Sequence, residues 1–169
     1  MPDLVARIDA LIAAAGVDPS RLMFEITETT AMQNVEKTSR TIKVLQSRGY
    51  AVAVDDFGTG YSSLGYLQRF RFDQIKIDGS FMHELDVGDQ RGSALLSAIV
   101  ALARALRIEV VAEGVETESQ FRTLRELSCD QMQGFLLSRP LPAADFVAFL
   151  RCADNRIVVT ENACATPGE

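Results

Sequence analysis

Short apolar segments alternate with stretches of helical pattern along almost the whole chain, and this order constrains the fold more than any other feature. Five segments are typical of strands: "RLMFEITE", "YAVAVDD", "QIKID", "EVVAEG" and "QMQGFLL". Helical patterns cover about 2–15, 34–48, 63–70, 92–106, 117–127 and 142–152. Because such alternation is typical of parallel sheets with crossover connections, the sequence predicts an α/β fold. We expect five parallel strands in chain order, with the helices outside them.

Residues that begin or end helices support these boundaries. Gly16 and Gly49 each follow a helical pattern, where glycine is common, and Asn34 is a typical N-cap. The segment "TESQ", residues 117–120, has the pattern of a capping box. No stretch has the composition of an interdomain linker. We therefore expect one domain over 1–153 and a loose tail over 154–169, which is mostly polar or small.

Composition excludes several classes of protein. The 169 residues carry a net charge of −6, which argues against a surface for a nucleic-acid polymer. No apolar run reaches the roughly 18 to 20 residues of a membrane helix, and the N-terminus lacks the pattern of a signal peptide. Cys129, Cys152 and Cys164 form neither a metal-binding pair nor an even disulfide set. We therefore expect a cytoplasmic protein with no membrane segment.

Polar side chains lie at or near the end of each predicted strand. In parallel α/β folds the carboxyl ends of the strands meet at one rim, where ligands bind. Side chains alternate across a strand, so Lys76 and Asp78 share a face while Asp55 and Asp56 diverge. We expect six of these residues to converge: Glu25, Asp55, Asp56, Lys76, Glu113 and Gln133.

Carboxylates brought this close repel one another unless a cation lies between them. An all-oxygen set suits Mg²⁺ or Mn²⁺ rather than zinc. Two such ions can activate water and stabilise the leaving oxygen in phosphodiester cleavage, and Lys76 could position the water or neutralise charge. The alternative is that single acidic residues cap helices or pair with Lys or Arg. Their repetition on four strands favours a functional site. A lone His83 is typical of a solvated loop.

Five motifs occur in the order, and at close to the spacing, of a known family: "FEITET", "VDDFGTGYSSL", "IKID", "VVAEGVET" and "QGFLLSRPLP". Over about 2–152 the chain resembles the C-terminal part of an EAL domain, the bacterial phosphodiesterase that hydrolyses cyclic di-GMP to linear pGpG. The resemblance implies a partial (β/α)₈ TIM-like barrel with about five of its strands. It also implies cyclic di-GMP as ligand and two Mg²⁺ or Mn²⁺ ions as cofactors.

The resemblance also assigns roles to individual residues. Metal ligands would be Glu25, Asp55, Asp56 and Glu113, with Asp56 bridging toward the second metal. The catalytic group would be Lys76, Glu113 and Gln133, with Lys76 contacting the catalytic water. Glu28 would hold the glycine loop 57–63, which the family links to metal binding and dimerisation, and Asp78 and Glu116 would lie on the rim. A homodimer through this loop or through exposed strand edges is expected.

One departure from the family is clear, because the sequence contains no Glu-Ala-Leu triplet. In the family this glutamate is a metal ligand, and the missing part would also supply an arginine and a metal-binding asparagine. Three strands of the barrel would be absent, and 169 residues fall short of the roughly 250 of such a fold. The chain could be a fragment, the product of a misplaced start or a genuine remnant. We expect it to be inactive alone, and the alternative function is a non-catalytic interaction or regulatory module.

Overall fold

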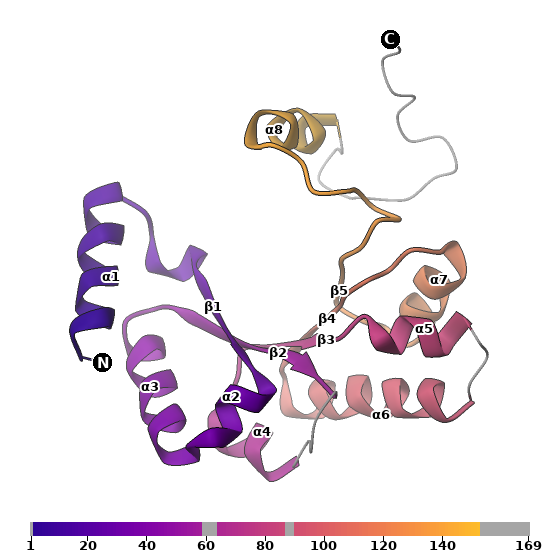
Figure 1. Ribbon diagram of the computed structural model, residues 1–169, viewed down its shortest axis with the longest axis horizontal. Coiled ribbons are helices and arrows are strands. Elements are labelled where there is room, and N and C mark those ends of the chain that lie inside the picture. Colours follow the sequence, from indigo (N-terminus) through magenta and orange to yellow (C-terminus); the bar gives the residue numbers. More distant parts are fainter. Residues whose placement is uncertain (1, 59–63, 87–89, 153–169) are drawn as a thin grey trace.

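The computed structural model describes residues 2–58, 64–86 and 90–152 (Figure 1). The predicted loose tail over 154–169 and residues 59–63 of the glycine loop lie outside this part of the chain. The described residues form a five-stranded sheet in which every neighbouring pair is parallel and the strand order is that of the chain. The predicted topology is therefore confirmed. The strands are β1 (Met23–Thr27), β2 (Ala51–Phe57), β3 (Gln74–Ile77), β4 (Glu109–Ala112) and β5 (Gln131–Met132).

The last strand is shorter than the seven residues predicted from "QMQGFLL". After β5 the chain turns at Gly134, whose carbonyl accepts hydrogen bonds from the N–H groups of Leu137 and Ser138. Gly134 lies so close to Val115 that a Cβ built on it would be 2.1 Å from the Val115 carbonyl oxygen. The apolar residues 135–137 therefore belong to a turn, and the prediction of strand there was wrong.

Helices lie between and around the strands, and two of them were not predicted. Helix α2 directly follows β1, with the Thr27 side chain accepting from the Thr30 N–H, and α5 begins shortly after β3. The predicted Asn34 cap and the capping box at Thr117 are both confirmed. The helices are α1 (Pro2–Ala15), α2 (Glu28–Gln33), α3 (Val35–Ser47), α4 (Leu64–Phe70), α5 (Ser80–Asp86), α6 (Gln90–Leu106), α7 (Glu118–Glu126) and α8 (Ala143–Cys152), with a 3₁₀ turn at Pro19–Arg21.

The hydrophobic core lies between one face of the sheet and the helices that cover it. Figure 1 shows α3, α4 and α6 on this side. Alternate residues of the central strands supply its sheet side, because successive side chains point to opposite faces. Buried core residues of the strands include Val52, Val54, Ile75, Ile77 and Val110, and those of the helices include Ile42, Leu45, Leu67, Leu96 and Ala103. The opposite face of the sheet carries polar side chains, among them Glu25, Asp55 and Lys76, together with the buried Ala53 and Val111.

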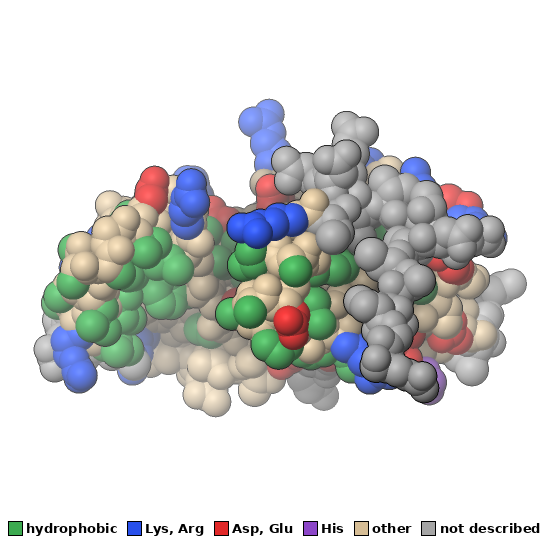
Figure 2. Space-filling model, turned by 90° about the horizontal axis from the view of Figure 1, so that it is seen from above, with side chains coloured by type: hydrophobic (Ala, Val, Ile, Leu, Met, Phe, Trp, Pro, Cys, Tyr) green, Lys and Arg blue, Asp and Glu red, His purple; other side chains and the backbone are tan. Residues whose placement is uncertain are grey.

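Helix α8 stands apart, above the strands in Figure 1, and packs little against them. Its large apolar side chains are about half exposed, at 48 % for Phe146 and 49 % for Leu150. Figure 2, seen from above, shows hydrophobic side chains on the outer surfaces of both α8 and α1, where Leu11 is 71 % exposed. Both helices therefore present large apolar side chains to solvent.

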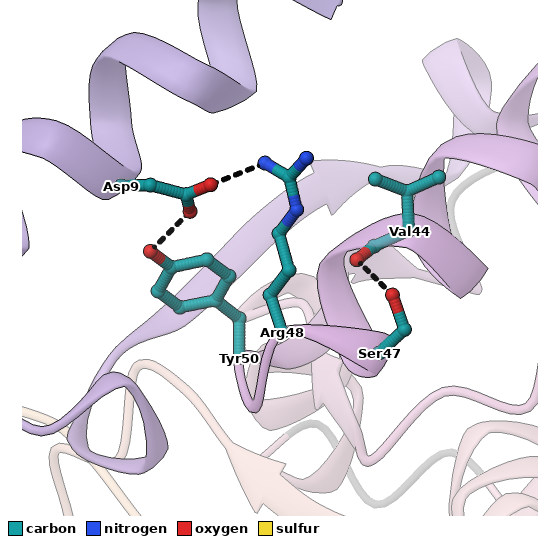
Figure 3. A network of polar contacts seen from close by, with 5 residues as sticks. All are labelled: Asp9, Val44, Ser47, Arg48 and Tyr50. Atoms are coloured by element: carbon teal, nitrogen blue, oxygen red, sulfur yellow. Dashed lines mark hydrogen bonds and ion pairs between the residues drawn. The ribbon is translucent and has the colours of Figure 1, made fainter.

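A polar cluster holds α1 against the turn between α3 and β2 (Figure 3). The Asp9 carboxylate accepts a hydrogen bond from the Tyr50 hydroxyl at 2.7 Å and forms an ion pair with Arg48. Tyr50 is buried, and Phe24 meets its ring edge-on with centroids 5.2 Å apart. Burial, together with the hydrogen bond to Asp9, raises the pKa of the Tyr50 hydroxyl. Tyr50 therefore stays a neutral donor at physiological pH, and Asp9 ties α1 to the rest of the domain.

We expect Asp9→Ala to loosen α1 and to lower the midpoint of urea unfolding, because Tyr50 and Arg48 both lose their acceptor. The measurement is a double-mutant cycle of Asp9→Ala and Tyr50→Phe. Their effects on the free energy of unfolding should be clearly non-additive, since the two side chains share one hydrogen bond. Asp145→Ala on exposed α8 is the control and should change little. Additive effects at positions 9 and 50 would contradict this account.

The end of β2 is irregular. Val54 pairs with Ile75 and Phe57 pairs with Ile77, so β2 holds one extra residue between these pairs. Asp55 and Asp56 together therefore lie opposite Lys76, as in a β-bulge. Asp56 takes up the irregularity with a φ of 53°, a left-handed conformation that aspartate tolerates better than most residues. Gly58 then follows with a φ of 99° against the ring of Phe81.

Gly58 should not tolerate a side chain. A Cβ at this position would be 2.6 Å from Cζ of the buried Phe81 ring, and the backbone conformation is itself unfavourable for alanine. We expect Gly58→Ala to lower the free energy of unfolding by about 2 kcal/mol or more. The control is Gly16→Ala, whose φ is 64° but whose Cβ would meet nothing within 4 Å. Equal losses in thermal unfolding for the two variants would show that the contact with Phe81 is unimportant.

Candidate active site

Three carboxylates converge on one ammonium group on the polar face of the sheet. Lys76 Nζ lies 2.8 Å from Glu25 Oε2, 3.0 Å from Asp55 Oδ1 and 2.9 Å from Glu113 Oε1. Lys76 is on β3, Glu25 on β1, Asp55 on β2, and Glu113 directly follows β4. Four neighbouring strands therefore contribute to one cluster, which we call the Lys76 centre.

The strand register explains why these side chains meet. Glu25 pairs with Ala53, so Asp55, two residues further along β2, is on the same face and nearer the carboxyl end. Lys76 pairs with Val111, and Glu113 lies two residues beyond it. The Glu113 N–H donates to the Ile77 carbonyl at 3.1 Å, which continues the ladder one step past β4. The sequence pattern thus brings the cluster to the carboxyl ends of the strands.

The Lys76 centre keeps its lysine charged. Burial lowers the pKa of the Lys76 ammonium, since its side chain is only 12 % exposed, but hydrogen bonds and ion pairs with Glu25, Glu113 and Asp55 outweigh burial. The net effect raises the pKa above its usual value. A lysine with a raised pKa stabilises the folded state fully below the usual pKa and loses this contribution only as the pH rises through the raised value. At neutral pH Lys76 is therefore a fixed cation and not a proton acceptor.

The donor set suits a hard divalent cation, although its present arrangement surrounds the lysine. All three carboxylates offer oxygen, which Mg²⁺ and Mn²⁺ prefer. Asp55 Oδ1 is buried, and its 3.0 Å contact with Lys76 Nζ lacks the angles of a hydrogen bond, so this oxygen has no hydrogen-bond partner. Over 2–58, 64–86 and 90–152 no group of three or more His, Cys, Asp or Glu side chains is arranged to hold a metal. A bound ion would therefore have to draw carboxylates away from Lys76.

Glu28 lies at the first position of α2 and is almost fully buried, with 2 % of its surface exposed. Its Oε2 accepts a hydrogen bond from the Gly58 N–H at 3.1 Å. This contact joins α2 to the residue that opens the glycine loop. The predicted role of Glu28 in holding that loop is compatible with this bond, but residues 59–63 lie outside the described chain.

The other predicted site residues lie at or just beyond the ends of their strands. Asp56 is at the bulge beside Asp55. Asp78 Oδ1 accepts from the Ser80 N–H at 2.9 Å, and hydrogen bonds to Ser80 lower the pKa of the Asp78 carboxyl. Asp78 thus bonds to the first residue of α5. This agrees with the alternative that a single acidic residue at a strand end caps the next helix. Glu116 is exposed.

The positions of Gln133 and His83 agree only in part with those predicted from the sequence. The Gln133 backbone continues the ladder beyond β5, because its N–H donates to Ala112 and its carbonyl accepts from Val115. Its side chain is exposed and makes no described contact with the Lys76 centre. His83 is also exposed, but on α5 rather than in the predicted loop.

A second polar layer, missed by the sequence reasoning, lies below the Lys76 centre on the same face. Gln74 Nε2 and Gln131 Nε2 both donate to Glu109 Oε2, at 3.4 and 3.2 Å. Gln131, on β5, therefore belongs to this lower layer. The signal for the layer was present, since Gln74 and Glu109 lie two and four residues before Lys76 and Glu113.

Comparisons with known proteins agree with this geometry. Residues 1–140 match the family described as EAL domain. The bifunctional diguanylate cyclase/cyclic di-GMP phosphodiesterase MucR of Pseudomonas aeruginosa is 44 % identical over 86 % of this chain and 21 % of its own length. Cyclic di-GMP phosphodiesterase NbdA of the same organism is 43 % identical over 88 % of this chain and 19 % of its own. The chain thus spans about a fifth of the length of these curated relatives.

Solved structures show the same fold. The phosphodiesterase PaMucR in complex with c-di-GMP superposes with a TM-score of 0.81 at 44 % identity, over 85 % of this chain and 57 % of that one. Klebsiella pneumoniae BlrP1, solved with manganese and cyclic di-GMP, gives a TM-score of 0.78 at 36 % identity, over 83 % of this chain and 36 % of that one. The five parallel strands are therefore part of a TIM-like barrel. No helix in the described ranges is both long and apolar enough to cross a membrane. The chain belongs to the EAL domain family.

Proposed function

We propose that this chain supplies part of the catalytic domain of a cyclic di-GMP phosphodiesterase, which hydrolyses the cyclic dinucleotide to linear pGpG in the cytoplasm with Mg²⁺ or Mn²⁺. The observation that carries the proposal is the Lys76 centre, where carboxylates from neighbouring strands converge on one cation in a member of the EAL family. Relatives named as cyclic di-GMP phosphodiesterases, and a neighbour solved with manganese and the dinucleotide, support it.

Metal ions would be held by Glu25, Asp55 and Glu113, with Asp56 reaching a second ion from the bulge. Bound ions of this kind make a coordinated water acidic enough to attack phosphorus and stabilise the leaving oxygen. The buried Asp55 Oδ1 is suited to a ligand role, because its described partner is the Lys76 ammonium, an ion pair without a hydrogen bond, and a divalent cation would take the place of that charge. Glu28 would hold the Gly58 N–H, and thereby the start of the loop above the site.

Lys76 acts as a cation in this scheme. Its raised pKa keeps the ammonium protonated, so it orients the attacking water and offsets negative charge on the phosphoryl oxygens. The water adds its oxygen to phosphorus as one ribose oxygen leaves. The proton lost by the water is balanced by the proton that the leaving ribose oxygen gains. Gln133, one residue past β5, would contact substrate or water at the rim, with Asp78 and Glu116 beside it.

A second candidate is a non-catalytic interaction or regulatory module. The half-exposed apolar side chains Phe146, Val147 and Leu150 on α8 favour it, because such surfaces are typical of contacts with other chains. The outer strands of the described sheet, β1 and β5, leave backbone groups for pairing. A homodimer through these edges, or through the loop 57–63, is compatible with either function.

Lys76→Met should strengthen Mn²⁺ binding even though it removes a proposed catalytic residue. Without the ammonium, three carboxylates repel one another and gain more from a divalent ion, so we expect the affinity to rise at least about tenfold from a millimolar starting point. Isothermal titration with MnCl₂ measures this, and Lys43→Met, which removes an exposed lysine on α3, is the control. Weaker binding by Lys76→Met would mean that Lys76 does not compete with the metal.

The activity test compares this chain with a form extended by in-frame sequence upstream of Met1. We expect the extended form to convert cyclic di-GMP to pGpG with Mg²⁺ or Mn²⁺, and this chain alone to give no detectable turnover. Glu25→Ala and Lys76→Ala in the extended form should each lower turnover by about 10² to 10³. Product is measured by chromatography. Robust turnover by the 169-residue chain would contradict the expectation, and inactivity of both forms would favour the interaction module.

A further inference from the structure

Gln120, on the first turn of α7, is a buried polar side chain outside the Lys76 centre that makes four side-chain hydrogen bonds. It is 3 % exposed. Its Oε1 accepts from the N–H groups of Glu116 and Thr117, at 2.7 and 3.0 Å. Its Nε2 donates to the Met82 carbonyl at 3.2 Å and to Asp86 Oδ2 at 2.7 Å. Every hydrogen-bonding group of the amide is therefore used.

These four bonds need an amide and no other side chain. Its oxygen faces two donors and its nitrogen faces two acceptors, so the reverse orientation of the amide would oppose all four. A glutamate could still accept from Glu116 and Thr117 but would place a second carboxylate against Asp86. The capping box explains the bonds to the helix N-terminus. It does not explain the two bonds that Nε2 makes to α5.

Gln120 bridges the two segments that leave the central strands of the site. Met82 and Asp86 are on α5, which follows Lys76 and Asp78. Glu116 and Thr117 follow Glu113, which comes directly after β4. The two segments already touch at their glycines, because a Cβ built on Gly114 would be 3.0 Å from the Gly79 Cα. The Gln120 amide joins the same two segments again, further along the chain. The connection after β4 is therefore held to the segment after β3 both at Gly114 and at Glu116 and Thr117.

We propose that Gln120 is a positioning residue of the site, holding the segment with Glu113 and Glu116 at a fixed place relative to Lys76. The inference rests on the proposed phosphodiesterase function. Gln120 acts through the backbone of Glu116 and does not itself touch a reacting group. Its loss should leave the carboxylates present but less well placed, which weakens metal binding and lowers turnover at saturating substrate.

The experiment compares three substitutions that separate positioning from helix capping. Gln120→Met removes all four bonds at similar side-chain length. Gln120→Glu keeps the acceptor for the capping box and loses both donations to α5. Thr117→Ala removes the other half of the capping box, since Thr117 Oγ1 accepts from the Gln120 N–H, together with the long 3.5 Å hydrogen bond from Thr117 Oγ1 to Asp86 Oδ1, and leaves the four amide bonds intact. Thr117→Ala is therefore the control for a merely structural effect.

Two readouts require no catalysis. Amide hydrogen exchange at Glu116 and Thr117 should be fast in Gln120→Met and slow in Gln120→Glu, while α5 should exchange faster in both. Mn²⁺ affinity, measured in the folded protein, should fall about three- to tenfold in Gln120→Met and stay unchanged in Thr117→Ala. In the upstream-extended form, kcat should fall by a similar factor with KM little changed.

Unchanged Mn²⁺ affinity and exchange in Gln120→Met would overturn the proposal, as would an equal loss of affinity in Thr117→Ala. If Gln120→Met does not fold, Gln120→Glu decides through the exchange of α5, which must be faster for the proposal to stand. Failure of the wild-type extended form to hydrolyse cyclic di-GMP would instead count against the proposed function. Hydrogen exchange would then still decide whether Gln120 fixes the segment.

Discussion

The ion pairs around Lys76 are the interaction on which the site depends. Carboxylates on neighbouring parallel strands are brought within a few ångströms by the sheet itself, and they would repel one another without a cation. One partly buried ammonium, 2.8 to 3.0 Å from three of them, offsets that repulsion in this chain. The same electrostatics make the cluster attractive to a divalent ion, so lysine and metal compete for the carboxylates.

The rest of the fold supports the face of the sheet that carries the Lys76 centre. Helices cover the other face and supply the core, which frees the alternate residues of each strand for polar roles. The bulge at Asp55 and Asp56 adds a carboxylate at the end of β2, and Glu28 holds the residue that follows. Beyond β4, Gln120 fixes the connection to α5. Local irregularities thus cluster around the carboxyl ends of the strands, where such folds place their ligands.

Sequence patterns predicted the elements that depend on local chemistry or on a repeating period. The strand order, the Asn34 cap and the capping box at Thr117 were all readable, and so was the convergence of Glu25, Asp55 and Glu113 at one rim. The short helices α2 and α5 were missed because six or seven residues leave little periodicity, although α4, which is as short as α5, was predicted. The bulge in β2 was missed because it depends on the register with β3. A strand was wrongly predicted beyond Met132, because the apolar residues there form a turn next to Val115. The contacts of Gln120 with α5 come from residues over 30 positions away in sequence, which no local pattern reveals.

The most direct test of the Lys76 centre is an NMR pH titration of the lysine side chains with ¹³C at Cε. Lys37, Lys43 and Lys76 are the lysines of the sequence, so the signals are few and can be assigned with single substitutions. If three carboxylates hold the ammonium, the Lys76 signal should titrate clearly above the usual lysine pKa of about 10.4. In Glu113→Gln the Lys76 pKa should shift down toward that value. A Lys76 signal that titrates at or below the usual pKa would contradict the account, because the carboxylates could not then be paired with its charge.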